Sequence, residues 1–96
     1  MSKGYWIARV NISDGEAYKE YAGKAKLAIE KHGGKYVTRG GKFSILEGEH
    51  DFERNVVVEF ESVEKAQECF NSKEYQEAKS CRDGKAKFNA IIIEGY

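Results

Sequence analysis

Hydrophobic residues alternate with other residues near the start of the chain. Within residues 4–12, one face of an extended segment would carry Trp6, Ala8, Val10 and Ile12. Successive side chains of a β-strand point to opposite faces of the sheet, so this spacing is typical of a strand. The sequence therefore predicts that a strand opens the fold.

Helical spacing replaces this alternation after residue 12. Four residues recur at spacings of four, three and four and would form one buried stripe: Tyr18, Ala22, Ala25 and Ile29. The segment Ser13-Asp14-Gly15-Glu16 matches a capping box, in which Ser13 and Glu16 satisfy backbone groups of the first turn. Gly33-Gly34 would end this helix.

Within residues 33–48, the dipeptide Gly40-Gly41 separates two further runs in which apolar residues alternate. Tight hairpin turns require positive φ angles, which glycine adopts without a steric penalty. We therefore predict a hairpin at these two glycines. Arg39 would lie at the end of its first strand, where the guanidinium could meet an anionic ligand.

The rest of the chain contains a polar loop, two strands and a divided helical region. Residues 49–54 are polar, whereas residues 55–60 are rich in β-branched residues that favour strands. Ser62 and Ser72 are each placed to cap a short helix, and residues 88–94 form the last apolar run. The order β-α-β-β-α-β, with the second helix broken, predicts an α+β fold of the ferredoxin-like type.

Several of these strands are apolar on both faces. In the first strand, Tyr5 and Ile7 would point to one face and Trp6 to the other. In the last strand, Ile91 and Ile93 would point to one face and the isoleucine between them to the other. Helices can cover only one face of such a sheet, and an uncovered apolar face is typical of an interface. We therefore expect a homodimer in which two sheets pack face to face.

Composition narrows the classes of function. The 96 residues suit a single domain, 1–96, and the 16 basic and 16 acidic residues balance, which argues against nucleic acid as a partner. No apolar run of about 18 residues is present to span a membrane, and the first residues do not resemble a signal peptide. Cys69 and Cys81 are too few for a disulfide scaffold, so we expect reduced thiols and a cytoplasmic location.

Candidates for site chemistry begin with charged residues in apolar strands. Arg9 and Glu59 could form a structural ion pair across neighbouring strands, or they could line a cavity in which Glu59 accepts a proton. Arg39 could hold a carboxylate or phosphate, or it could form a surface ion pair. Arg54 and Arg82 are further candidates of the same kind.

The remaining candidates are tyrosines and histidines. Tyr21 and Tyr75 could orient a ligand through their hydroxyl groups, although aromatic packing is the commoner role of such residues. His32, at the expected end of the first helix, fits a solvated residue better than a general base. The spacing of His32 and His50 predicts no metal site. Neither a nucleophilic triad nor a nucleotide-binding loop is visible, so we expect no cofactor.

Short motifs occur in a fixed order from one end of the chain to the other: Gly4-Tyr5-Trp6, Tyr18, Tyr21, Arg39-Gly40-Gly41, Glu47-Gly48, Val58-Glu59-Phe60, Ser62, Ser72, Glu74-Tyr75-Gln76, Arg82 and Glu94-Gly95. Together they resemble the DUF1330 family, small bacterial proteins of unknown function in the dimeric α+β barrel superfamily. Glu61 departs from the family pattern, which usually has proline there. The resemblance implies a ferredoxin-like subunit and a dimer with back-to-back sheets, and it implies no particular activity.

The wider superfamily includes cofactor-free monooxygenases, lactone isomerases, haem-degrading enzymes and ligand-binding proteins, and the fold does not select among them. Haem degradation is disfavoured, because neither histidine follows a clear pocket-facing helical pattern. Our leading hypothesis is a homodimer that binds a small organic molecule, which could be anionic. One alternative is a cofactor-independent monooxygenase or isomerase. Another is a structural or regulatory dimer without a ligand.

In the leading hypothesis the pocket lies between the sheet and a helix, near the dimer interface. Arg39 would orient an anionic group, and Glu59 would accept a proton. The pocket wall would come from Tyr21, Tyr75 and Arg82. Arg9 and His32 complete the set of candidate ligand-binding residues.

Overall fold

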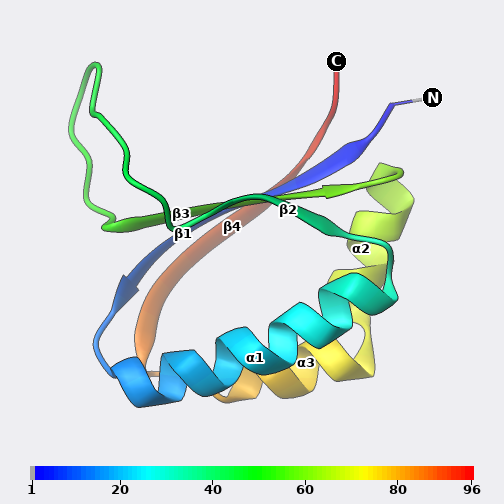
Figure 1. Cartoon of the computed structure of the whole chain (residues 1–96), viewed down its shortest axis with the longest axis horizontal. Helices are drawn as coiled ribbons and strands as arrows, with labels where there is room; N and C mark the ends of the chain where they lie inside the picture. Colours follow the sequence, from blue (N-terminus) through cyan, green and yellow to red (C-terminus); the bar gives the residue numbers. More distant parts are fainter. Residues whose placement is uncertain (1) are drawn as a thin grey trace.

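Four antiparallel strands form one sheet, and helices cover one of its faces (Figure 1). The computed structural model describes residues 2–96. Its elements are β1 (Gly4–Ile12), α1 (Gly15–Lys31), β2 (Lys35–Arg39), β3 (Arg54–Phe60), α2 (Val63–Asn71), α3 (Lys73–Ser80) and β4 (Ala86–Glu94). The strands lie side by side in the order β2-β3-β1-β4. The predicted β-α-β-β-α-β order, with its second helical region divided, is confirmed.

Helix starts follow local signals closely. Ser62 and Ser72 cap α2 and α3 as predicted, because each side chain accepts a hydrogen bond from a backbone N–H three residues further on. At α1 the prediction is wrong by one residue, since Asp14 rather than Ser13 is the N-cap. The Ser13 hydroxyl instead donates to the Lys85 carbonyl at 2.7 Å, which ties the start of α1 to the start of β4.

The predicted hairpin at Gly40-Gly41 is wrong. Residues 42–46 belong to no strand, and residues 40–53 form a long loop on the side of the sheet away from the helices (Figure 1). Strand β2 pairs with β3 instead, whose β-branched run suits a strand better than the glycine-flanked run does. Gly40 has the expected positive φ of 74°, yet its N–H donates to the Asn55 carbonyl at 3.0 Å and so closes the β2–β3 pairing.

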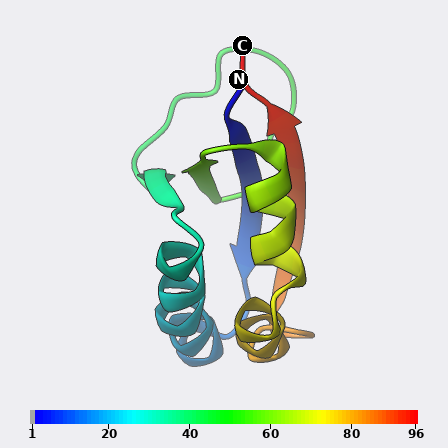
Figure 2. The ribbon, with the colours of Figure 1, turned by 90° about the vertical axis from the view of Figure 1, so that its right-hand side faces the viewer.

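The core lies between the sheet and the helices, on what we call the inner face of the sheet. Trp6, Ala8 and Val10 of β1 are buried there, as their alternation predicts, and the Trp6 indole donates to the Ala66 carbonyl at 3.0 Å. Beneath the sheet, α1 lies on one side and α2 with α3 on the other (Figure 2). No helix within residues 2–96 is long and apolar enough to cross a membrane.

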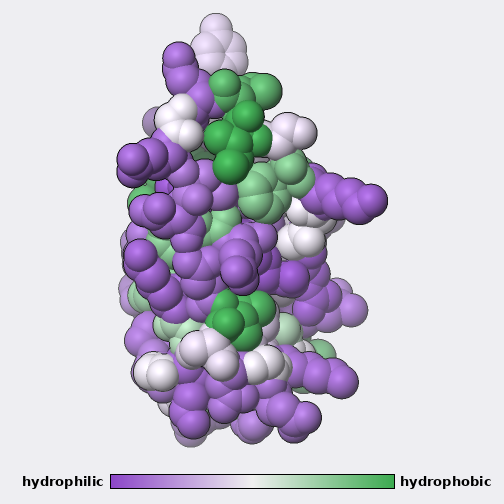
Figure 3. Space-filling model, turned by 90° about the vertical axis from the view of Figure 1, so that its left-hand side faces the viewer, coloured by the Kyte–Doolittle hydropathy of each residue, from purple (hydrophilic) through white to green (hydrophobic). Residues whose placement is uncertain are grey.

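The outer face of the sheet carries no helix (Figure 1). Tyr5 and Ile7 point to this face, opposite Ile93 and Ile91 of β4, and both isoleucines are exposed. The tip of the long loop adds further exposed apolar side chains, Phe43, Ile45 and Leu46, and hydrophobic atoms gather at this end of the molecule (Figure 3). The predicted uncovered apolar face is therefore present.

Candidate functional site

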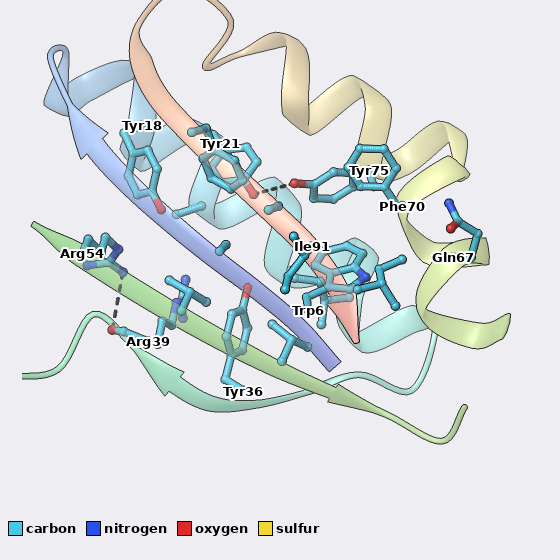
Figure 4. Close-up of a pocket in the computed structure, with 18 residues that line it drawn as sticks. Trp6, Tyr18, Tyr21, Tyr36, Arg39, Arg54, Gln67, Phe70, Tyr75 and Ile91 are labelled. Carbon is cyan, nitrogen blue, oxygen red and sulfur yellow. Dashed lines mark hydrogen bonds between the residues drawn. The ribbon is translucent and has the colours of Figure 1, made fainter. Parts of the chain in front are cut away.

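A cavity of about 470 Å³ lies between the inner face of the sheet and the helices (Figure 4). Its size falls in the range of small-molecule sites, which is roughly 300–1,000 Å³. Aromatic and aliphatic residues make most of the wall: Trp6, Ala8, Tyr18, Tyr21, Ala22, Ile29, Tyr36, Val56, Val58, Phe70, Tyr75, Phe88, Ala90, Ile91 and Ile92. Three further lining residues, Arg39, Arg54 and Gln67, supply the other polar groups.

Arg39 and Arg54 lie together on the strand side of this cavity (Figure 4). Residue 39 ends β2 and residue 54 begins β3, so antiparallel pairing brings the two arginines side by side, and Arg54 Nη2 donates to the Arg39 carbonyl at 3.5 Å. The guanidinium of Arg39 is 4.7 Å from the centre of the Tyr36 ring, and that of Arg54 is 5.6 Å from the centre of the Tyr18 ring. Both cations therefore rest on aromatic faces.

Neither arginine of the cavity forms an ion pair with a described residue, because every ion pair within residues 2–96 uses a lysine. The Nε atom of Arg54 is buried and has no hydrogen-bond partner among these residues. Most buried polar groups in proteins are hydrogen-bonded, so such an atom calls for an explanation. A ligand oxygen would provide one.

Two tyrosine hydroxyl groups meet on the helix side of the cavity. Tyr21 of α1 and Tyr75 of α3 lie 2.8 Å apart, oxygen to oxygen (Figure 4). Behind them Arg82 is only 6% exposed, and its Nη2 donates to the Tyr75 hydroxyl at 3.4 Å. Its guanidinium lies 3.6 Å from the centre of the Phe88 ring. Burial raises the pKa of Tyr21 far above its usual value, so this hydroxyl keeps its proton at neutral pH.

The charge of the cavity differs from that of the chain. The chain has a formal net charge of zero, but the ionisable lining residues are arginines and tyrosines, with no acidic residue, histidine, lysine or cysteine. At neutral pH the wall therefore carries positive charge without a compensating negative one. Such a site attracts anions and lacks an ordinary proton acceptor.

The structure brings together part of the predicted set of site residues. Arg39, Tyr21 and Tyr75 line one cavity, and Arg82 supports the tyrosine pair from behind. His32 lies apart from the cavity at the end of α1, where its Nδ1 is 2.9 Å from the Ala28 carbonyl oxygen.

The prediction that Arg9 and Glu59 pair across the sheet is wrong. The strand register places Arg9 opposite Asn55, and it places Glu59 opposite Tyr5, which lies four residues before Arg9 in β1. Glu59 instead accepts a hydrogen bond from the Tyr5 hydroxyl at 3.0 Å, and the Arg9 guanidinium lies 5.1 Å from the centre of the Phe52 ring. Both charged residues alternate with inner-face residues, so they lie on the outer face and Glu59 cannot take a proton from a ligand in this cavity.

Tyr36 and Gln67 line the cavity although neither is predicted from the sequence as a site residue, and Arg54, the weaker candidate, lines it beside Arg39. The available signal for Tyr36 is the adjacent Lys35, which is exposed, whereas its other neighbour, Val37, is apolar although it is exposed too. No comparable signal marks Gln67, because its contact with the cavity depends on how α2 packs.

Cysteine and metal chemistry find little support in the described part of the chain. Cys69 is buried, and burial raises the pKa of its thiol to about 12, so it remains protonated at neutral pH. Residues 2–96 contain no cluster of three or more histidine, cysteine or carboxylate side chains that could hold a metal ion.

Comparison with known proteins agrees with this fold. The sequence profile of the family described as "Domain of unknown function (DUF1330)" matches residues 3–96. No protein among the curated sequences matches the chain. Among solved structures, the RPA0582 protein of unknown function from Rhodopseudomonas palustris has a TM-score of 0.80 and 21% identity, over 99% of this chain and 83% of that chain.

Two more distant structures belong to proteins with a named activity. SnoaB, a cofactor-independent oxygenase from Streptomyces nogalater, has a TM-score of 0.64 and 7% identity, over 97% of this chain and 92% of that one. A putative antibiotic biosynthesis monooxygenase from Nitrosomonas europaea has a TM-score of 0.55 and 19% identity, over 99% of this chain and 98% of that one. At these identities the similarity shows a shared α+β fold and nothing further.

Proposed function

Since the chain belongs to the DUF1330 family, whose function is unknown, we propose from its cavity that it binds a small organic anion. One observation carries the proposal: Arg39 and Arg54 line an aromatic cavity whose wall contains no carboxylate. A guanidinium offers donors in a fork that matches a carboxylate, and its charge is not neutralised by the protein here. The ligand would therefore have a carboxylate or similar group at the arginines and an apolar body along the aromatic wall.

We also propose that the protein is a cytoplasmic homodimer. The outer sheet face supports the dimer, because Ile91 and Ile93 are exposed there beside Ile7, and a second copy of the sheet would cover them. The cytoplasmic location is supported by Cys69 and Cys81, which are both free.

A cofactor-independent oxygenase is the second candidate. The named activity of SnoaB and the aromatic cavity favour it. The absence of a carboxylate or histidine from the described wall weighs against it, because chemistry that begins with proton removal needs an acceptor. The same argument weighs against an isomerase. A structural dimer without ligand is less favoured, since a cavity of about 470 Å³ is present.

The test of anion binding uses acids and their uncharged amides. Phenylacetate, benzoate and 2-naphthoate are each compared with the matching amide by thermal shift, and the dissociation constants of hits are measured by calorimetry. Ligands that bind only the folded state raise the melting temperature. We expect at least one acid to do so and its amide to bind about tenfold more weakly, because the charge-assisted hydrogen bonds are lost.

Three single variants locate the site. Arg39→Ala and Arg54→Ala should each weaken binding of that acid about tenfold or more. Arg9→Ala is the matched control, since Arg9 lies on the outer face and should leave the affinity unchanged. Equal binding of acids and amides, or equal losses in all three variants, would contradict the proposal. Oxygen uptake in the presence of an acid, without added cofactor, would instead favour the oxygenase.

A further inference from the structure

The tyrosine pair on the helix side of the cavity plays no part in holding an anion at Arg39 and Arg54. Tyr21 and Tyr75 come from α1 and α3, and their hydroxyl groups meet at 2.8 Å beside the cavity. We propose that this pair, backed by Arg82, is a second polar subsite that donates a hydrogen bond to an oxygen of the ligand. The inference rests on the proposed function, because it assigns a second group to the same ligand.

Arg82 fixes one hydrogen bond of the tyrosine pair. A guanidinium has only N–H donors, so the Tyr75 oxygen must accept the bond from Arg82 Nη2. Two hydroxyl protons then remain for the pair, and only one of them can lie between the two oxygens. The other has no acceptor among the described residues. It is therefore available to a group in the cavity, whichever tyrosine carries it.

Arg82 also sets the charge that this subsite prefers. Arg82 is only 6% exposed, its Nε has no partner within residues 2–96, and no described carboxylate forms an ion pair with it. Burying an unpaired cation is costly, so a fold that retains one points to a role beyond stability. A cation next to a hydroxyl makes that hydroxyl a better donor to an oxygen with negative charge.

The two subsites together describe a class of ligand. One end carries a carboxylate, which meets Arg39 and Arg54, and the other end carries a phenol or enol oxygen, which meets the tyrosine pair. The aromatic wall between them suits a planar ring. The subsite should favour the ionised form of that oxygen, because a donor backed by positive charge stabilises phenolate or enolate over the neutral form.

A pair of coloured probes tests this assignment. The first is 4-hydroxy-3-nitrophenylacetate, whose absorbance reports ionisation of its phenol, and the second is 3-nitrophenylacetate, which lacks the hydroxyl. We expect the hydroxyl probe to bind at least tenfold more tightly. We also expect the pKa of its bound phenol to fall by about one unit, since tenfold in affinity for the ionised form equals one unit.

Variants assign the effect to the tyrosine pair. Tyr75→Phe and Arg82→Met should each remove most of the tenfold preference for the hydroxyl probe over 3-nitrophenylacetate, and the absorbance change with it. Tyr5→Phe is the matched control, because the Tyr5 hydroxyl lies on the outer face against Glu59. Should Tyr75→Phe fail to fold, Tyr21→Phe removes the partner hydroxyl, and the absorbance of the wild-type complex still reports the effect.

The outcomes separate the two proposals. Equal affinity for both probes, with no change in phenol ionisation, would overturn the second subsite and leave anion binding intact. A preference that survives Tyr75→Phe and Arg82→Met would also overturn it, since another group must then contact the oxygen. Failure of both probes to bind would contradict anion binding by this cavity and the subsite with it.

Discussion

The guanidinium of Arg54 packs directly against the backbone of Gly40. A Cβ atom at residue 40 would overlap the guanidinium, lying 2.5 Å from its Cζ, and the φ angle of Gly40 is 74°. The positive φ favours glycine, because an L side chain is strained in the left-handed region. A Cβ at residue 40 would also push the Arg54 guanidinium out of its present position. Gly40 therefore helps to place Arg54 at the cavity, although its sequence context suggests a hairpin.

Gly40→Ala is expected to impair both stability and binding. The left-handed backbone should cost about 1–2 kcal/mol of unfolding free energy. Displacement of Arg54 should weaken binding of the best carboxylate probe several-fold. Urea unfolding and calorimetry measure the two effects. The control is Gly41→Ala, because a Cβ at residue 41 would meet nothing within 4 Å. Equal effects of the two substitutions would contradict the role given to Gly40.

Arg82→Met should leave the protein as stable as the wild type, or more stable. Replacing buried ionic groups with apolar ones of similar size is often neutral or stabilising, by up to about 4 kcal/mol. Methionine can fill part of the space beside Phe88 that the Arg82 guanidinium occupies now. Urea unfolding provides the measurement, with Arg9→Met on the outer face for comparison. A loss of more than about 2 kcal/mol would mean that Arg82 is retained for stability.

Stability should decline at alkaline pH through buried tyrosines. The pKa of Tyr36 is raised from 10.0 to about 12, chiefly by burial, and burial raises that of Tyr21 too. The folded state thus keeps protons that the unfolded chain has already lost. The contribution of Tyr36 to the free energy of unfolding is complete below about pH 10 and is lost as the pH rises to about 12.

Urea unfolding between pH 8 and pH 12 should show this loss, and Tyr36→Phe should make the decline smaller. Tyr96→Phe serves as the control, because Tyr96 is fully exposed. The prediction does not survive if the alkaline decline is the same in wild type and Tyr36→Phe.

Ile93→Lys should convert the proposed dimer to a monomer. Ile93 is 47% exposed on the outer face opposite Tyr5, so a lysine there would place a charge within the sheet-to-sheet contact. Sedimentation velocity of both proteins is the measurement. Leu27→Lys is the control, because it makes a similar change on α1 at a residue that is 70% exposed and away from the sheet, so it should leave the dimer intact. A wild-type protein that sediments as a monomer would refute the dimer itself.

Local patterns in the sequence determined most of the secondary structure. Alternation predicts β1, the serines at residues 62 and 72 predict the starts of α2 and α3, and the break between them divides the second helical region. Each signal acts over a few residues, through side-chain direction or a capping bond, so it can be read without knowing the rest of the fold.

The tertiary structure alone decided the strand register, the face of the sheet to which each side chain points, and which side chains lie close together. Gly40-Gly41 has the local pattern of a hairpin turn, yet β2 pairs with β3 rather than with the residues that follow the two glycines. This pairing places Arg39 beside Arg54. Arg9 and Glu59 share apolar strands in the sequence, but the β1–β3 register holds them apart on the outer face. Strand pairing depends on contacts between distant segments, and a shift of one residue would exchange the two faces. The cavity, its positive charge and the tyrosine pair are consequences of that pairing and of helix packing.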